Sequence, residues 1–218
     1  LGASTTGASN VAVGAFALDA NTTGDSNVAV GEQALSANTD GNYSVAIGKD
    51  ALALNTTGIR NIAIGFGALD ANTTTNDNIG IGYLALSANT AASNVAVGYN
   101  SMALNTTGID NTALGANSLD SNTTGSDNTA IGDNALGAAQ TSSANTAVGS
   151  GALLVNTAAT NTAIGAYALD ANTTGSSGVA VGKDALGANT TGNENTAVGE
   201  GAMEDNTTGS TNVAIGRE

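Results

Sequence analysis

The sequence predicts an all-β fold, a parallel β-solenoid of about thirteen coils of 17 residues. A five-residue segment, Asn-Val-Ala-Val-Gly at 10–14, returns thirteen times with small changes. The closing glycines are 17 residues apart, except for two spacings of 16 residues. A period this regular is typical of stacked repeats. The closing glycines are Gly14, Gly31, Gly48, Gly65, Gly82, Gly98, Gly115, Gly132, Gly149, Gly165, Gly182, Gly199 and Gly216.

The residues before each glycine predict a short strand. β-branched residues dominate the positions one and three residues before it, as at Val13 and Val11, and such residues favour pleated strands. Because side chains two residues apart share a face, we expect this pair to point into the coil. The glycine is expected to have positive φ or to lie against a neighbouring backbone. Leu or Met follows four residues later, as at Leu18, and predicts a second inward-facing anchor on a second short strand.

The segment Asn-Thr-Thr-Gly, as at 21–24 and 55–58, predicts a turn. Asn and Gly tolerate left-handed backbone, and Asn makes local side-chain hydrogen bonds. Both 16-residue spacings lose a residue in this segment, at 89–93 and 156–160, which is typical of a surface loop. Stacked Asn side chains can also form ladders between coils.

The composition favours one elongated repeat domain over residues 1–218, and we expect it to be a fragment of a longer fibre because neither end has a polar cap. The formal net charge is −14, from 18 acidic and four basic residues. This charge opposes binding to nucleic acid and docking on anionic membranes. No apolar run is long enough to insert directly into a membrane.

Catalytic chemistry has no support in the residue inventory. The chain has no His and no Cys, so the usual general base and thiol nucleophile are missing, and we predict no enzyme and no catalytic residue. Aspartates recur in the turns, where oxygen ligands could suit Ca²⁺. Hydrogen bonding to the local turn backbone explains them better, so no metal site and no cofactor are predicted. These residues are Asp25, Asp40, Asp77, Asp110 and Asp127.

A stripe of small residues follows the centre of the predicted strands. If the β-branched pair faces inward, the residue between must face outward, and nothing there is larger than a methyl group. We therefore expect a homo-oligomer interface along this stripe, since cyclic symmetry satisfies every copy at once. The alternative is a monomer whose own turn segment covers the stripe. The stripe consists of Ala12, Ala29, Ala46, Ala63, Gly80, Ala96, Ala113, Ala130, Ala147, Ala163, Ala180, Ala197 and Ala214.

Three aromatic residues, Phe66, Tyr83 and Tyr99, directly follow the closing glycine in consecutive coils. They are expected to stack as a ladder about one strand spacing apart. Such a ladder is a candidate contact for a glycan or a protein partner. The alternative, which we favour, is that it only stabilises the stacking of coils.

Threonines form two further patterns. Thr112, Thr129, Thr146 and Thr162 replace Val in four consecutive strands, and we expect a buried, hydrogen-bonded stack. Thr pairs also recur in the turns, as at 22–23 and 56–57, which raises the possibility of an ice-binding solenoid. Adjacent residues in a strand point to opposite faces, so these pairs do not place two rows of Thr side by side on one flat face.

The repeated segments at 10–14 and 44–48, Asn-Val-Ala-Val-Gly and Ser-Val-Ala-Ile-Gly, resemble the head repeats of trimeric autotransporter adhesins. The resemblance implies a left-handed parallel β-roll with three chains around one axis. It also implies a structural and adhesive segment of an extracellular fibre on a bacterial cell surface, with a host-surface protein or glycan as partner. Similar repeats look like those of phage tail fibres, so the alternative is a tail-fibre shaft on a virion. The coil here is longer than is typical of the family, with the Asn-Thr-Thr-Gly turn as the extra part.

Overall fold

The structure, a computed structural model, describes residues 6–217. This part of the chain holds thirteen three-residue strands and no helix, and so no helix that could cross a membrane. The chain divides into two compact units, Leu1–Asp110 and Asn111–Glu218. The strands of the first unit are β1 (Val11–Val13), β2 (Val28–Val30), β3 (Val45–Ile47), β4 (Ile62–Ile64), β5 (Ile79–Ile81) and β6 (Val95–Val97). Those of the second are β7 (Thr112–Leu114), β8 (Thr129–Ile131), β9 (Thr146–Val148), β10 (Thr162–Ile164), β11 (Val179–Val181), β12 (Thr196–Val198) and β13 (Val213–Ile215).

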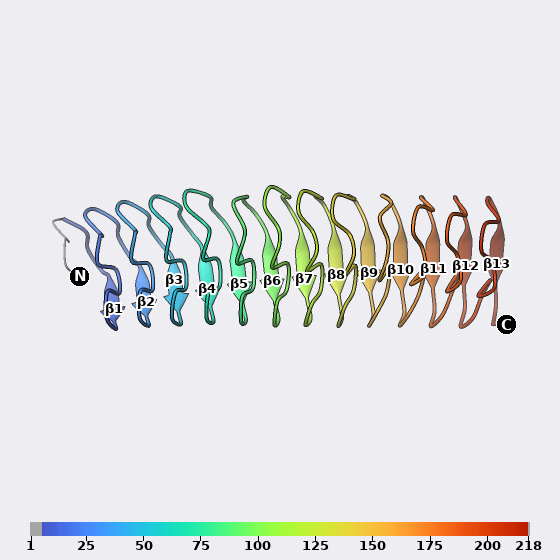
Figure 1. Cartoon of the computed structure of the whole chain (residues 1–218), viewed down its shortest axis with the longest axis horizontal. Coiled ribbons are helices and arrows are strands. Elements are labelled where there is room, and N and C mark those ends of the chain that lie inside the picture. The colour runs from blue at the N-terminus through green and yellow to red at the C-terminus, as the bar shows by residue number, and fades with distance from the viewer. Residues whose placement is uncertain (1–5, 218) are drawn as a thin grey trace. The chain divides into compact units, whose positions relative to one another are not determined.

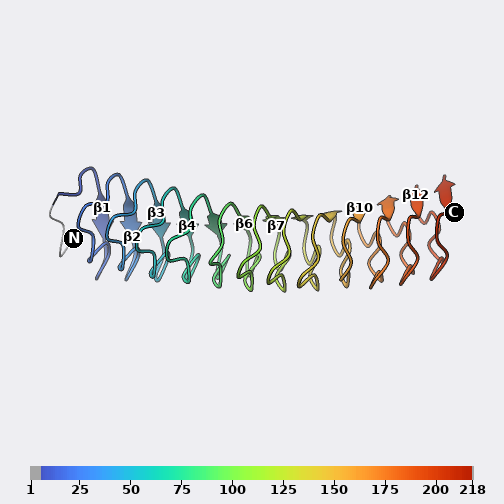
Figure 2. The same ribbon diagram turned by 90° about the horizontal axis from the view of Figure 1, so that it is seen from above.

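Within each unit every strand pairs in parallel with the next strand of the chain (Figure 1). The register places like residues side by side, so that Ala29 pairs with Ala46 and Val28 with Val45. In the second unit the strands lie along one edge of the coils in Figure 2, and the turns reach the opposite edge. The predicted parallel β-solenoid of roughly 17-residue coils is thereby confirmed.

The orientation of the strands differs from the prediction. The central alanines point into the coil, where Ala29 and Ala46 are completely buried, whereas the β-branched neighbours point outward, with Ile47 38% exposed. The reason is the narrow interior. A Cβ added to Gly80, at the same central position, would lie only 3.0 Å from the carbonyl oxygen of Ala85 and 3.2 Å from Cγ of Leu69. This interior leaves room for little more than a methyl group, so the bulkier pair lies outside.

The segment that carries the inward Leu is a series of turns, so the predicted second strand is wrong. In the second coil, residues 32–37 form turns, and φ is positive at Gln33 (60°) and at Leu35 (51°). Leu35 is still completely buried, as predicted for an inward anchor, and its N–H donates to the carbonyl of Ala51 in the next coil (3.0 Å). Left-handed backbone is most unfavourable for β-branched residues. This explains why only Leu and Met occupy the position.

The closing glycine meets both expectations for it. Gly31 has φ of +138°, and a Cβ placed on it would lie 2.4 Å from the carbonyl oxygen of Gly48 in the next coil. No side chain fits between two backbones at that separation. The glycines therefore let the chain turn away from the strand while adjacent coils remain one strand spacing apart.

Buried asparagines form a first ladder, which we call the turn ladder, at the start of each turn. The Nδ2 group of Asn38 donates to Oδ1 of Asn21 in the preceding coil (2.9 Å) and to the carbonyl of Gly41 in its own turn (3.1 Å). Asn55 repeats the arrangement with Asn38 and Gly58, both at 3.0 Å. The predicted Asn ladder is confirmed, and it lies in the core.

A second ladder, which we call the pre-strand ladder, precedes each strand. The backbone N–H of Ser44 donates to Oδ1 of Asn27 in the preceding coil (2.9 Å). Nδ2 of Asn27 donates to the carbonyl of Gly41 in the following turn (2.7 Å). The two ladders therefore converge on one carbonyl oxygen, and each coil is tied to the next through both. A buried amide is tolerated only when its polar atoms are paired in this way.

Within residues 6–217 one coil lacks its turn-ladder asparagine. Ala139 occupies that position, is completely buried, and cannot donate to Oδ1 of Asn122 in the preceding coil. We expect Ala139→Asn to extend the ladder and raise the free energy of unfolding by about 1 kcal/mol, since a hydrogen bond of this kind has a net value of that order. Thermal or denaturant unfolding measures the gain. Ala138→Asn, one residue away at a partly exposed site, is the matched control, and equal effects of the two changes would contradict the ladder explanation.

Candidate functional site

The outward side chains of the strands form an aliphatic face in the first unit. The side chains are partly exposed and in register from strand to strand. We call the strand-start residues the first column and the strand-end residues the second column. In the first unit the first column is Val11, Val28, Val45, Ile62, Ile79 and Val95, and the second column is Val13, Val30, Ile47, Ile64, Ile81 and Val97.

The second unit presents the same face with a different first column. Thr112, Thr129, Thr146, Thr162 and Thr196 replace the aliphatic residues there, and Val179 and Val213 keep them. These threonines point outward and are partly or well exposed, so the predicted buried Thr stack is wrong, for the same reason that the β-branched pair lies outside. The second column is Leu114, Ile131, Val148, Ile164, Val181, Val198 and Ile215.

The outward strand face carries no charged residue in any coil, although the chain carries a net charge of −14. The acidic residues lie instead after the closing glycine, as at Glu32, or in the turn region, as at Asp77. An exposed sheet face normally carries polar or charged side chains. A partly exposed aliphatic face without charge is therefore a candidate contact surface.

The alanine stripe cannot be the contact surface that the sequence suggested. Its members from Ala29 to Ala197, Gly80 included, are buried inside their own coils. A second chain reaches only the side chains on either side of the stripe. The prediction of an outward Ala stripe is therefore wrong, and the aliphatic face takes its place as the candidate interface.

The aromatic ladder has the expected geometry. The ring centroids of Phe66 and Tyr83 are 5.4 Å apart with an interplanar angle of 14°, and those of Tyr83 and Tyr99 are 5.4 Å apart at 10°. The predicted stacking is confirmed, whereas contact with a partner stays a prediction. The three side chains are 44–54% exposed. Because the rings cover each other's faces, the ladder presents mainly ring edges and the two tyrosine hydroxyls.

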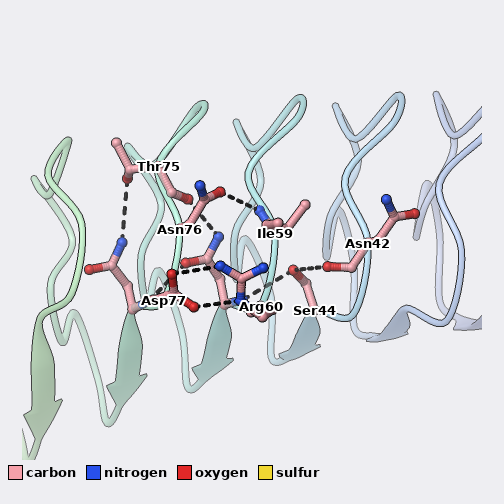
Figure 3. Close-up of polar contacts among 9 residues, drawn as sticks. Asn42, Ser44, Ile59, Arg60, Thr75, Asn76 and Asp77 are labelled. Carbon is pink, nitrogen blue, oxygen red and sulfur yellow. Dashed lines mark hydrogen bonds and ion pairs between the residues drawn. The ribbon is translucent and has the colours of Figure 1, made fainter.

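Polar contacts join the coils beside the turns (Figure 3). Arg60 binds Asp77 through two hydrogen bonds, Nε to Oδ1 at 2.6 Å and Nη2 to Oδ2 at 2.8 Å. Next to them the N–H of Ile59 donates to Oδ1 of Asn76 (2.8 Å). Arg60 lowers the pKa of Asp77 through this hydrogen bond, and Asp77 raises the pKa of Arg60. The pair is solvent-exposed, so its effect on stability is small.

Two further turn aspartates, like Asp77, accept hydrogen bonds from neighbouring coils. Oδ1 of Asp25 accepts from the N–H of Ala8 (2.6 Å), and Oδ1 of Asp40 accepts from the hydroxyl of Thr23 (2.8 Å). This supports the structural explanation of these residues, although the partner is the adjacent coil and not the aspartate's own turn. Within residues 6–217 no three acidic side chains gather closely enough to form a metal site.

The first turn threonine also has a structural role. The hydroxyl of Thr56 donates to the carbonyl of Thr73 in the next coil (3.0 Å), and that of Thr190 donates to the carbonyl of Thr207 (3.0 Å). The 16-residue coils keep this bond, as Thr157 donates to Thr173 (2.8 Å). A hydrogen bond between coils therefore accounts for threonine at this position without ice binding.

The surface residues also show a longer period of three coils, which was not predicted. From the first to the tenth coil, an acidic residue follows the inward Leu in every third coil, at Asp19, Asp70, Asp120 and Asp170, and Glu204 after Met203 departs from this period. Large apolar residues recur in the same way at a neighbouring turn position, at Leu54 and Leu104 (52% and 55% exposed) and at Val155 (38%). The signal was visible in the sequence, because comparing every third coil exposes it.

Partial burial perturbs three of these aspartates. Loss of solvent raises the pKa of Asp70, Asp120 and Asp170, and the charge of Asp50 raises the pKa of Asp70 further. In all three the ionised form is disfavoured because the carboxylate has lost water. These groups are too far apart along the chain to form one acidic site, since three coils separate them.

No protein-family model, curated protein or solved structure matches the sequence.

The pKa shift of Asp70 predicts a pH dependence of stability. Because its pKa is raised in the folded state, its contribution favours folding below its unfolded pKa and is lost as pH rises through the folded value. We expect Asp70→Asn to raise the melting temperature slightly at pH 7 and to flatten the loss of stability as pH rises above 3.8, the ordinary pKa of an Asp carboxyl. Unfolding curves across this range measure the effect. Asp77→Asn is the control, because Arg60 lowers the pKa of Asp77 and the loss of that pair should have the opposite sign at pH 7.

Proposed function

We propose that the chain is a structural and adhesive rod segment of an extracellular trimeric fibre. Stacked coils give a stiff scaffold whose side chains repeat at one strand spacing. The role of such a segment is to extend the fibre and to present a binding surface, without catalysis. The observation that carries the proposal is the charge-free aliphatic face along the strands of both units.

A second copy of the same chain is the partner that this face fits. The face is built from three-residue strands in strict register, so it repeats at the coil spacing, and another copy repeats at the same spacing. Both copies are acidic, but their charges lie away from the strands, so the faces can meet without placing carboxylates against each other. Cyclic symmetry then buries the face of each copy equally. The number three comes from the resemblance to trimeric autotransporter adhesin heads.

The resemblance also supports a place on the bacterial cell surface. A phage tail-fibre shaft would use the same rod on a virion. The sequence that flanks this segment in the full protein distinguishes them, since an outer-membrane barrel anchor indicates an adhesin and a baseplate-binding end indicates a tail fibre. The segment would have the same role in an adhesin and in a tail fibre.

The proposed interface predicts a separation of assembly from folding. We expect Val45→Glu with Ile64→Glu, both on the aliphatic face, to give a folded monomer, because burying unpaired carboxylates at an interface costs several kcal/mol, roughly 2–5. Light scattering measures the mass in solution, and circular dichroism measures folding.

Two variants serve as controls for that experiment. Ala46→Glu, on the buried stripe between the two columns, should unfold the first unit instead of dissociating the assembly. Thr57→Glu, in an exposed turn, should change neither mass nor folding. A double variant that keeps the wild-type mass while folded would show that the aliphatic face is open to water.

The aromatic ladder predicts an attachment phenotype. We expect replacing Phe66, Tyr83 and Tyr99 together by Ser to reduce binding to host cells or to a glycan array, since the exposed ring edges and hydroxyls are lost. Stability should fall by about 1 kcal/mol for each of the two stacked pairs. Tyr43→Ser removes an exposed tyrosine elsewhere and is the control. Unchanged attachment by a folded triple variant would leave the ladder with a structural role alone.

A further inference from the structure

Near-identical coils create a problem for the assembly proposed above. A neighbouring copy displaced along the fibre by one coil would meet almost the same side chains in almost the same positions. The second column of the second unit is aliphatic in every strand, so it cannot distinguish one coil from another. Some other feature must select a register, as turns and side-chain patterns do in ordinary sheets.

The first column of the second unit has the required irregularity. From β7 to β13 it consists of four threonines, a valine, a threonine and a valine. This order does not repeat from coil to coil. If the two chains are displaced by one coil, threonine of one chain lies beside valine of the other at several coils. Without displacement, each threonine lies beside the same threonine of the other chain.

The threonine hydroxyls of this column are available to a partner. The hydroxyls of Thr129, Thr146 and Thr162 make no hydrogen bond within the described part of the chain, and neither does that of Thr196. The turn threonines behave differently, since Thr173 donates to the carbonyl of Thr190 (2.9 Å). The strand threonines therefore do not stabilise their own coil through hydrogen bonds, and an aliphatic residue would fit the same outward site, as Val179 shows.

We infer that the Thr and Val pattern at the first column of β7–β13 selects the register in which copies of this chain associate. In register, threonines of different copies lie at one level, where their hydroxyls can bond to each other or to a shared water. Out of register, a hydroxyl faces valine and loses water without gaining a partner. This inference rests on the proposed association through the strand face. A single buried polar residue specifies register in coiled coils by the same physical rule.

A pattern swap tests the inference with unchanged composition. Val179→Thr combined with Thr196→Val moves one threonine by one coil and conserves the total number of threonines. The swapped chain and the wild-type chain, one carrying a mass tag, are unfolded together in equal amounts and refolded. Native mass spectrometry then counts pure and mixed assemblies. We expect each chain to assemble with itself as well as before, and mixed assemblies to fall about tenfold below the statistical fraction, since two coils are mismatched.

The possible outcomes separate the inference from the proposed function. Statistical mixing of two assembling chains would overturn the register code and leave the association intact. Wild-type chain that stays monomeric would overturn both. Tagged and untagged wild-type chains, refolded together, give the reference for unbiased mixing. A second control, Thr174→Ser with Thr191→Ser in the exposed turns, should mix freely with wild type.

Discussion

The structure depends on the burial of one carbonyl group per coil. In the turn at residues 38–41 the carbonyl oxygen of Gly41 accepts hydrogen bonds from the side chains of Asn38 and Asn27, at 3.1 Å and 2.7 Å. Asn38 also donates to Oδ1 of Asn21 in the preceding coil, and Oδ1 of Asn27 accepts from the backbone N–H of Ser44 in the next coil. The polar groups that a turn would otherwise expose thus become part of the interior. With so much of the interior occupied by amides, one Leu or Met side chain per coil and small residues, mostly Ala, fill the rest.

The narrow interior determines what the outside looks like. Since a strand centre accepts little more than methyl, the larger β-branched residues must lie on the surface, and the protein gains an aliphatic face that a wider solenoid would have hidden. The same constraint forces Leu35 and its equivalents into left-handed backbone, because the chain has to curl tightly after the strand. Surface chemistry and backbone conformation therefore share one cause, which is the size of the coil.

The period, the strands, the parallel stacking and the Asn ladder could all be predicted, because they follow from spacing and residue type. Which face of the strand points into the coil could not be predicted. The alternation of Val11, Ala12 and Val13 is compatible with either face pointing inward. The prediction that the two valines point inward assumed that large apolar side chains fill the core. The alanine points inward because the space beside Leu69 is small and the two asparagine ladders occupy the rest of the interior. Neither cause can be recognised from the sequence of a three-residue strand. The aromatic stack was predictable since Phe66, Tyr83 and Tyr99 share one position in successive coils.

The recurrence of Asp19, Asp70, Asp120 and Asp170 in every third coil has a consequence for how such a chain changes length. Each coil bonds mainly to its immediate neighbours, so a duplication or deletion of any whole coil restores the internal contacts. The pattern of surface side chains is restored only when three coils are gained or lost together. Recombination between repeats would then generate segments of different length with the same interior, while the spacing of surface acids and of Leu54 and Leu104 would be kept only by triplets.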